Sequence, residues 1–90
     1  MLVNVGYGNI VNMDKVVCVV KTESAPIKRM IQQMKDINMA VDATCGRKTK
    51  SVLVMDSGHI VLSALLPETV ENRSQIVRVD DIERNMEDEQ

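Results

Sequence analysis

Short apolar runs separated by polar turns fill most of the first two thirds of the chain. The runs are rich in Val, Ile and Leu, which favour strands, while Gly, Asn and Asp occupy the gaps and favour turns. This pattern predicts strands at residues 2–5, 10–11, 15–21, 39–44, 51–55 and 59–65. Asp56, Ser57 and Gly58 join the last two runs, which predicts a β-hairpin.

A helical periodicity interrupts these strands after Ser24. The apolar residues that recur at helical spacing and form one stripe are Ile27, Met30, Ile31, Met34 and Ile37. Ser24 is expected to cap the start of the helix, with Pro26 tolerated in its first turn, and Asn38 to close the helix in a left-handed conformation. Because Pro67 ends the last strand, a further short helical turn is predicted at residues 68–73.

These elements together predict an α+β fold with a mainly antiparallel sheet and one main helix. Residues 1–73 are expected to form one domain, because a chain of 90 residues has room for no more. The polar and acidic residues 74–90 are expected to form a flexible tail.

The strand patterns predict more apolar surface than one helix can cover. Residues 51–55 and 59–65 are apolar on both faces, and the apolar run around Cys18 is expected to be buried on both faces, with the thiol in the core. The helix stripe covers only one face of the sheet. We therefore expect the other face to meet further copies of the chain in a symmetric homo-oligomer.

The net charge of −2 conceals two regions of opposite sign. Residues 1–66 carry eight Lys and Arg against five acids, whereas residues 67–90 carry three Arg against eight acids. A basic body with an acidic tail is a charge asymmetry seen in nucleic-acid-binding proteins. Taken alone, this feature favours the alternative of a solvated tail without a function. The two cysteines form no disulfide framework or metal-site pattern, and neither a signal peptide nor an apolar run of about 18 residues is evident, so we expect a cytoplasmic protein with reduced thiols.

The densest cation cluster is the basic loop, Gly46-Arg47-Lys48-Thr49-Lys50. Arg47 can grip a phosphate with two parallel hydrogen bonds, and Lys48 and Lys50 act as point charges. Thr49 adds a hydroxyl donor, and Gly46 lets backbone N–H groups approach an anion. The loop therefore predicts a phosphate-binding surface, and a solvated loop without a function is the alternative.

Other classes of function fit the sequence less well. Proteins that bind single-stranded nucleic acid stack bases on aromatic side chains, and Tyr7, the only Phe, Tyr or Trp, lies outside the basic loop in the sequence. His59 is the single histidine, and no acid–base pair, nucleophile arrangement or metal-ligand set emerges, so no enzyme activity, metal or cofactor is expected. Double-stranded DNA is the expected partner, with Lys15 as a further contact. An RNA-binding post-transcriptional regulator and an interaction scaffold are the alternatives.

Five motifs occur in one order between Leu2 and about Arg73. They are Gly6-Tyr7-Gly8-Asn9, Ser24-Ala25-Pro26-Ile27-Lys28-Arg29, Val41-Asp42-Ala43-Thr44, Gly46-Arg47-Lys48-Thr49-Lys50, and Leu62-Ser63-Ala64 with Pro67-Glu68-Thr69-Val70. In these motifs the chain resembles the extracellular matrix regulatory protein RemA family of bacterial DNA-binding regulators. Five motifs in one order over so short a chain make the resemblance specific.

The resemblance implies a transcription regulator that activates operons for the biofilm matrix, with a core similar to LytTR-type DNA-binding domains. It also implies a ring-shaped homo-oligomer, an octamer by resemblance, that binds duplex DNA along its outside. The DNA-contacting motif of the family, Gly-Arg-Arg-Thr-Arg, falls on residues 46–50, and Lys15 matches a basic residue of the family near the start of the third strand. Lys48 and Lys50 stand where the family has Arg, which keeps the charge but loses bidentate contacts.

Overall fold

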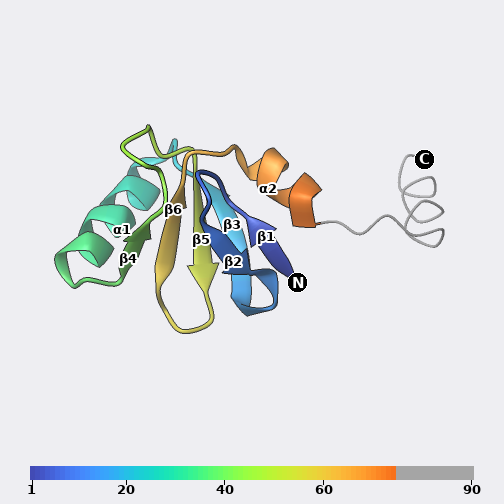
Figure 1. The fold of residues 1–90 in the computed structure, drawn as a ribbon. Helices are drawn as coiled ribbons and strands as arrows, with labels where there is room; N and C mark the ends of the chain where they lie inside the picture. The colour runs from blue at the N-terminus through green and yellow to red at the C-terminus, as the bar shows by residue number, and fades with distance from the viewer. Residues whose placement is uncertain (75–90) are drawn as a thin grey trace, which may run out of the picture.

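The computed structural model describes residues 1–74, and the predicted tail lies outside these residues except for Ser74. The elements are β1 (Leu2–Asn4), β2 (Ile10–Asn12), the 3-10 turn η1 (Met13–Lys15), β3 (Val16–Lys21), α1 (Ala25–Asp36), β4 (Ala40–Asp42), β5 (Ser51–Met55), β6 (Ile60–Ser63) and α2 (Pro67–Ser74) (Figure 1). Each predicted strand region contains a strand, so the predicted element order is confirmed. Within residues 1–74, neither helix has the length and apolar character needed to pass through a lipid bilayer.

The sheet is mixed rather than purely antiparallel. Four strands form it in the order β3-β5-β6-β4, and β1 pairs with β2 in a separate antiparallel hairpin. Strand β5 lies antiparallel to both β3 and β6, whereas β4 runs parallel to β6. The parallel pair arises because α1 carries the chain across the sheet between β3 and β4, which then run in the same direction. The α+β class and the mainly antiparallel sheet are therefore confirmed.

Helix α1 is capped at both ends as its sequence predicts. The hydroxyl oxygen of Ser24 accepts a hydrogen bond from the N–H of Ile27 over 3.4 Å. At the other end Asn38 has a φ of 60°, and the N–H groups of Asn38 and Met39 donate back to carbonyl oxygens of the last turn over 3.2 and 2.8 Å. These two bonds form a Schellman motif, which satisfies carbonyl groups that the helix end would leave without partners.

The apolar stripe of α1 packs on one face of the sheet. It covers Val52, Ile60 and Leu62, whose side chains are almost completely buried. The stripe residues packed against them are Ile27, Met30, Ile31 and Met34. Ile37, the fifth predicted member, is 63% exposed because it is the C-cap, where the chain already leaves the helix. The prediction is therefore wrong at this position.

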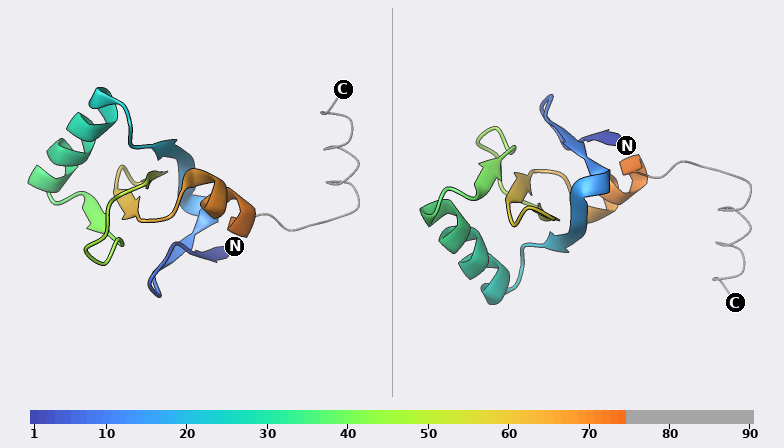
Figure 2. Two further views of the ribbon diagram at one scale, coloured as in Figure 1. Left: turned by 90° about the horizontal axis from the view of Figure 1, so that it is seen from above. Right: turned by 90° about the horizontal axis from the view of Figure 1, so that it is seen from below.

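The opposite face of the sheet is covered by the chain itself. Helix α1 lies on one side, and the β1–β2 hairpin and α2 lie toward the other (Figure 2). The buried residues of this second core are Val5, Val11, Ala43, Leu53, Val61 and Val70. The expectation that another subunit must cover this face is therefore wrong. The hairpin and α2 are too short to show a clear periodicity, yet both place apolar side chains in the core. Self-association stays a prediction.

Strand β3 is an edge strand and is not buried on both faces. Among residues 1–74 it pairs only with β5, and the register shifts between Val16 and Cys18. Val17 is 67% exposed and Cys18 is exposed as well, so the prediction that this thiol is in the core is wrong for the subunit. The apolar run has another cause: Val19 packs against one core and Val20 against the other.

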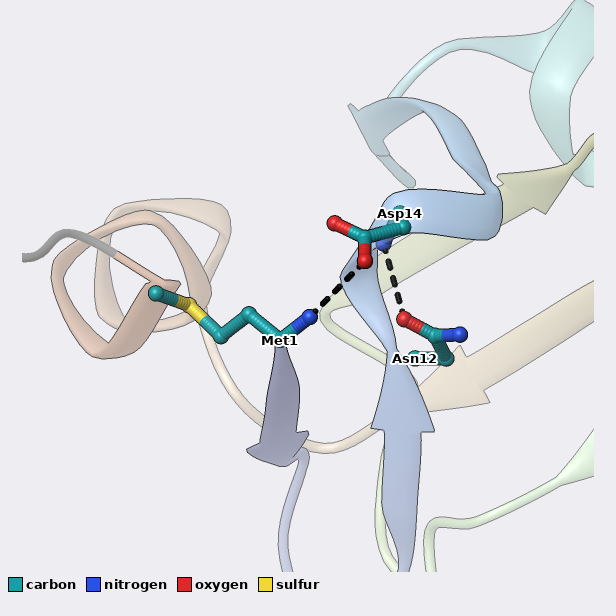
Figure 3. A network of polar contacts seen from close by, with 3 residues as sticks. All are labelled: Met1, Asn12 and Asp14. Atoms are coloured by element: carbon teal, nitrogen blue, oxygen red, sulfur yellow. Dashed lines mark hydrogen bonds and ion pairs between the residues drawn. The ribbon is translucent and has the colours of Figure 1, made fainter.

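A small polar network closes the open end of the β1–β2 hairpin (Figure 3). The amino group of Met1 donates to Oδ2 of Asp14 over 3.0 Å, and the N–H of Asp14 donates to Oδ1 of Asn12 over 3.1 Å. The N–H of Met13 also donates to the carbonyl oxygen of Met1 over 2.8 Å. The first residue is thus tied to the turn η1 that leads into β3.

Candidate nucleic-acid interface

The basic loop follows a tight turn. The N–H of Arg47 donates to the carbonyl oxygen of Thr44 over 3.0 Å, and Cys45 and Gly46 between them have φ angles of 54° and 78°. Two successive positive φ angles are characteristic of a type I′ turn. Gly46 adopts its angle without the steric penalty that a Cβ atom brings, whereas Cys45 bears that penalty.

A second turn of the same kind lies beside the first. The N–H of Asn9 donates to the carbonyl oxygen of Gly6 over 3.1 Å, and Tyr7 and Gly8 between them have φ angles of 55° and 79°. The side-chain amide of Asn9 also donates to the carbonyl oxygen of Ala43 over 3.4 Å, which joins the two turns. The β1–β2 turn and the β4–β5 connection therefore meet at one end of the molecule, the upper end in Figure 1.

We call this end, which carries Arg47, Lys48 and Lys50, the basic end, and Tyr7 belongs to it. The guanidinium carbon of Arg47 lies 4.9 Å from the centre of the Tyr7 ring, within the range of a cation–π interaction. Tyr7 lies outside the basic loop in the sequence, yet the fold places its ring beside that loop. The two residues are far apart in the chain, and only the pairing of the two turns brings them together. The sequence offers one signal that the two turns are related: each has Gly as its second central residue, Gly8 in one and Gly46 in the other.

Asp42 holds the first residue of the basic turn. Its carboxylate accepts hydrogen bonds from the hydroxyl and from the N–H of Thr44, the latter over 2.9 Å, and Thr44 is buried. The hydroxyl bond and then the N–H bond lower the pKa of Asp42. Burial raises this pKa by less than either bond lowers it, and the charge of Lys35 has the smallest effect and lowers it. The acid nearest to the basic loop in the sequence is thus bound to Thr44.

The rest of the basic loop is fixed to the sheet. The N–H of Lys50 donates to a carbonyl oxygen at the end of β6 over 2.8 Å, and the hydroxyl of Thr22 donates to the carbonyl oxygen of Thr49 over 3.1 Å. Arg47, Lys48 and Lys50 are exposed, whereas Thr49 is half-buried. None of the three cations forms an ion pair with another residue of the described range 1–74. A fixed backbone therefore presents their positive charges to solvent.

A hollow of about 450 Å³ separates the start of α1 from the basic loop. Its lining residues are Thr22, Glu23, Lys28, Ile31, Lys48 and Thr49. Lys28 therefore lies near the basic loop, with Glu23 lining the same hollow. The N-terminus of α1, which carries the positive end of the helix dipole, lies at the same end (Figure 1). The sequence does not reveal the position of Lys28, because the start of α1 and the basic loop are distant in the chain.

Lys15 lies at the opposite end of the sheet. It precedes β3, whose first residue pairs with Met55, whereas the last residue of β3 pairs with Ser51 beside the basic loop. The ammonium group of Lys15 is 4.0 Å from a carboxylate oxygen of Asp56, and both side chains are exposed. The structure thus brings together Arg47, Lys48 and Lys50 but leaves Lys15 apart from them within one subunit. Its contact with DNA stays a prediction.

Comparison with known proteins agrees with the motifs. The family described as RemA-like, extracellular matrix regulatory protein A-like, matches residues 2–73. A regulatory protein of Lachnoclostridium phytofermentans is 60% identical over 72 residues, which are 80% of this chain and 79% of that protein. The extracellular matrix regulatory protein A of Bacillus subtilis is 53% identical over 75 residues, which are 83% and 84% of the two chains. A regulatory protein of Trichormus variabilis is 53% identical over 77 residues, which are 86% and 88%. The chain therefore belongs to the RemA-like family of extracellular matrix regulatory protein A-like proteins.

Proposed function

We propose that this protein binds duplex DNA through its basic end and activates the transcription of genes for the extracellular matrix. The regulatory part of this proposal is supported by the family and by the name of the Bacillus subtilis relative. The DNA-binding part is supported by one observation above all. Arg47, Lys48 and Lys50 are exposed on an anchored backbone and form no ion pair with an acid in residues 1–74.

Phosphate groups suit this arrangement chemically. The guanidinium of Arg47 can donate two parallel hydrogen bonds to one phosphate, and the ammonium groups of Lys48 and Lys50 follow the charge of the backbone without fixed geometry. Because Lys replaces Arg at two positions of the family motif, Arg47 is the one residue of the basic loop that can make a bidentate contact with a phosphate. We expect the two lysines to contribute affinity and Arg47 to contribute both affinity and orientation.

A single basic end would hold DNA weakly, so the proposal includes a ring-shaped homo-oligomer. Several copies arrayed along one duplex raise the affinity by about two to four orders of magnitude without any new contact. Exposed apolar side chains support self-association of the subunit. They are Leu2, Ile10, Val17, Ile37, Val41 and Leu66, each more than half exposed.

A mobility-shift assay with duplex DNA over a salt series tests this function. Neutralising several phosphates releases counterions, so affinity is expected to fall steeply between about 50 and 200 mM salt. The double variant Arg47→Ala with Lys48→Ala should abolish the shift, and light scattering should show an unchanged assembly. Arg29→Ala with Lys35→Ala is the matched control, because it removes the same charge from exposed positions of α1. Equal loss in both double variants, or tight binding that salt does not weaken, would contradict the proposal.

Single-stranded RNA is the second candidate ligand, and Tyr7 is the observation that favours it. The ring is 51% exposed and lies at the basic end, where a base could stack on it. One aromatic side chain per subunit is few for such a binder, and Arg47 already lies over the ring. Competition between a single-stranded RNA and a duplex DNA of equal length decides between the two. We expect the duplex to win.

A further inference from the structure

The contact between Tyr7 and Arg47 joins two turns that share one geometry. Tyr7 is the first central residue of its turn and has a φ of 55°, and Cys45 has the same place and a φ of 54° in the turn that ends at Arg47. An aromatic residue rarely adopts a positive φ, because its Cβ atom crowds the neighbouring carbonyl group. Such conformations persist where the surrounding structure holds them, and they cluster at functional sites.

The surrounding structure does hold the Tyr7 turn. The N–H of Val5 donates to the carbonyl oxygen of Asn9 over 2.9 Å, and the N–H of Gly6 donates to Oδ1 of Asn4 over 2.7 Å. Val5 is completely buried in the core between the sheet and the hairpin. The direction of the Tyr7 side chain is therefore set by the fold, although half of the ring is exposed to solvent.

We propose that Tyr7 is a positioning residue for DNA binding, whose ring holds the guanidinium of Arg47 in place for a phosphate. The inference rests on the proposed function and extends it to a residue outside the basic loop. A long, exposed Arg side chain loses conformational freedom when it grips a phosphate, which opposes binding. Contact with the ring restricts Arg47 before DNA arrives and thereby reduces that loss.

The contact leaves the hydrogen-bonding groups of Arg47 available. A cation–π contact uses the face of the ring and the charge of the guanidinium, whereas bonds to phosphate use N–H groups around the edge of the guanidinium plane. Arg47 forms no ion pair within residues 1–74, so its bidentate donors remain open to a ligand. The ring can thus hold the side chain and leave its phosphate contacts unchanged.

Two substitutions, Tyr7→Asn and Tyr7→Phe, distinguish the effect of the ring from the effect of the turn backbone. Asn tolerates a positive φ, so Tyr7→Asn removes the ring and keeps the turn, while Tyr7→Phe keeps the ring and removes only the hydroxyl. Each full-length variant is titrated with sheared duplex DNA at low ionic strength, alone and combined with Arg47→Ala. We expect Tyr7→Asn to weaken binding about two- to fivefold, Tyr7→Phe to restore it, and Tyr7→Asn to add nothing to Arg47→Ala.

The outcomes distinguish the two proposals. If Arg47→Ala leaves DNA binding unchanged, both the proposed function and this inference fail. If Arg47→Ala weakens binding but Tyr7→Asn does not, only the positioning role fails. The role is also overturned if Tyr7→Phe binds as weakly as Tyr7→Asn, or if Tyr7→Asn weakens binding equally in the Arg47→Ala background.

A spectroscopic measurement checks the contact without DNA. Tyr7 is the only tyrosine and the chain has no Trp or Phe, so the two doublets of its ring in a proton NMR spectrum need only be distinguished from the two singlets of His59. Arg47→Ala should shift these doublets, whereas Arg29→Ala should leave them in place. Ring signals that are indifferent to Arg47→Ala would overturn the positioning role.

Discussion

Ser51 and Ser63 face each other across β5 and β6 and are both completely buried, but only Ser63 has partners for its hydroxyl. The hydroxyl of Ser63 donates to the carbonyl oxygen of Val5 over 2.8 Å and accepts from the N–H of Leu65 over 3.1 Å. Within residues 1–74, the hydroxyl of Ser51 has no hydrogen-bond partner. Ser63 therefore ties the N-terminal hairpin to the end of the sheet that carries the basic loop.

This difference predicts opposite results for the same substitution on two neighbouring residues. Ser63→Ala should lower the free energy of unfolding by about 1–3 kcal/mol, because it leaves a buried carbonyl group and an N–H group without partners. Ser51→Ala removes a buried hydroxyl that has no partner, so it should be neutral or slightly stabilising. Urea unfolding of both variants measures the two effects, and equal destabilisation would contradict the assigned hydrogen bonds.

Helix α2 should contribute to stability through one side chain. Val70 is completely buried against the core under the β1–β2 hairpin. Val70→Ala should lower the free energy of unfolding by about 2 kcal/mol, because it removes buried methyl groups and leaves a cavity. Asn72→Ala, an exposed position of the same helix, is the control and should have little effect. An unchanged melting temperature for Val70→Ala would mean that α2 does not cover the sheet in solution.

Substitution of Gly46 should destabilise the protein through backbone strain rather than through steric crowding of the new side chain. Its φ is 78°, and a Cβ atom built there would meet no atom within 4 Å. Gly46→Ala should therefore lower the free energy of unfolding by about 1–2 kcal/mol through the left-handed conformation alone. Gly46→Asn should cost less, since Asn tolerates this region. Thermal unfolding compares the two variants, and equal losses would place the cause elsewhere.

Asp42 should stabilise the basic turn except in acid. Because its bonds to Thr44 lower the pKa of Asp42 in the folded protein, the charged form is favoured by folding. The resulting stability is present above the unfolded pKa of about 3.9 and is lost as the pH falls through the lower folded value. Asp42→Asn keeps an acceptor oxygen without the charge. Asp42→Asn should lower the free energy of unfolding by a small amount at pH 7, because Asp42 is exposed. This difference from the unsubstituted chain should vanish at low pH. Unfolding curves measured from pH 7 downward test both expectations.

The local patterns of the chain were sufficient to predict the elements and their caps. Ser24 and Asn38 close α1 through bonds to residues a few positions away, and the alternation of apolar residues marks the strands. These features depend on neighbours in the sequence, so the sequence alone can show them. The basic loop was predictable for the same reason, because Arg47, Lys48 and Lys50 are close together in the chain.

Only the tertiary structure decided what covers the sheet and what completes the basic end. The hairpin and α2 were each too short to reveal a buried face, and the position of β3 at the sheet edge left Cys18 exposed. Tyr7 contacts Arg47, and Lys28 lines the same hollow as Lys48, although these residues are distant in the chain. The fold places Lys15 at the opposite end of the sheet. Residue types and local spacing determine which elements form. Which side chains meet depends on how those elements pack, since each contact of this kind joins parts of the chain that share no local pattern.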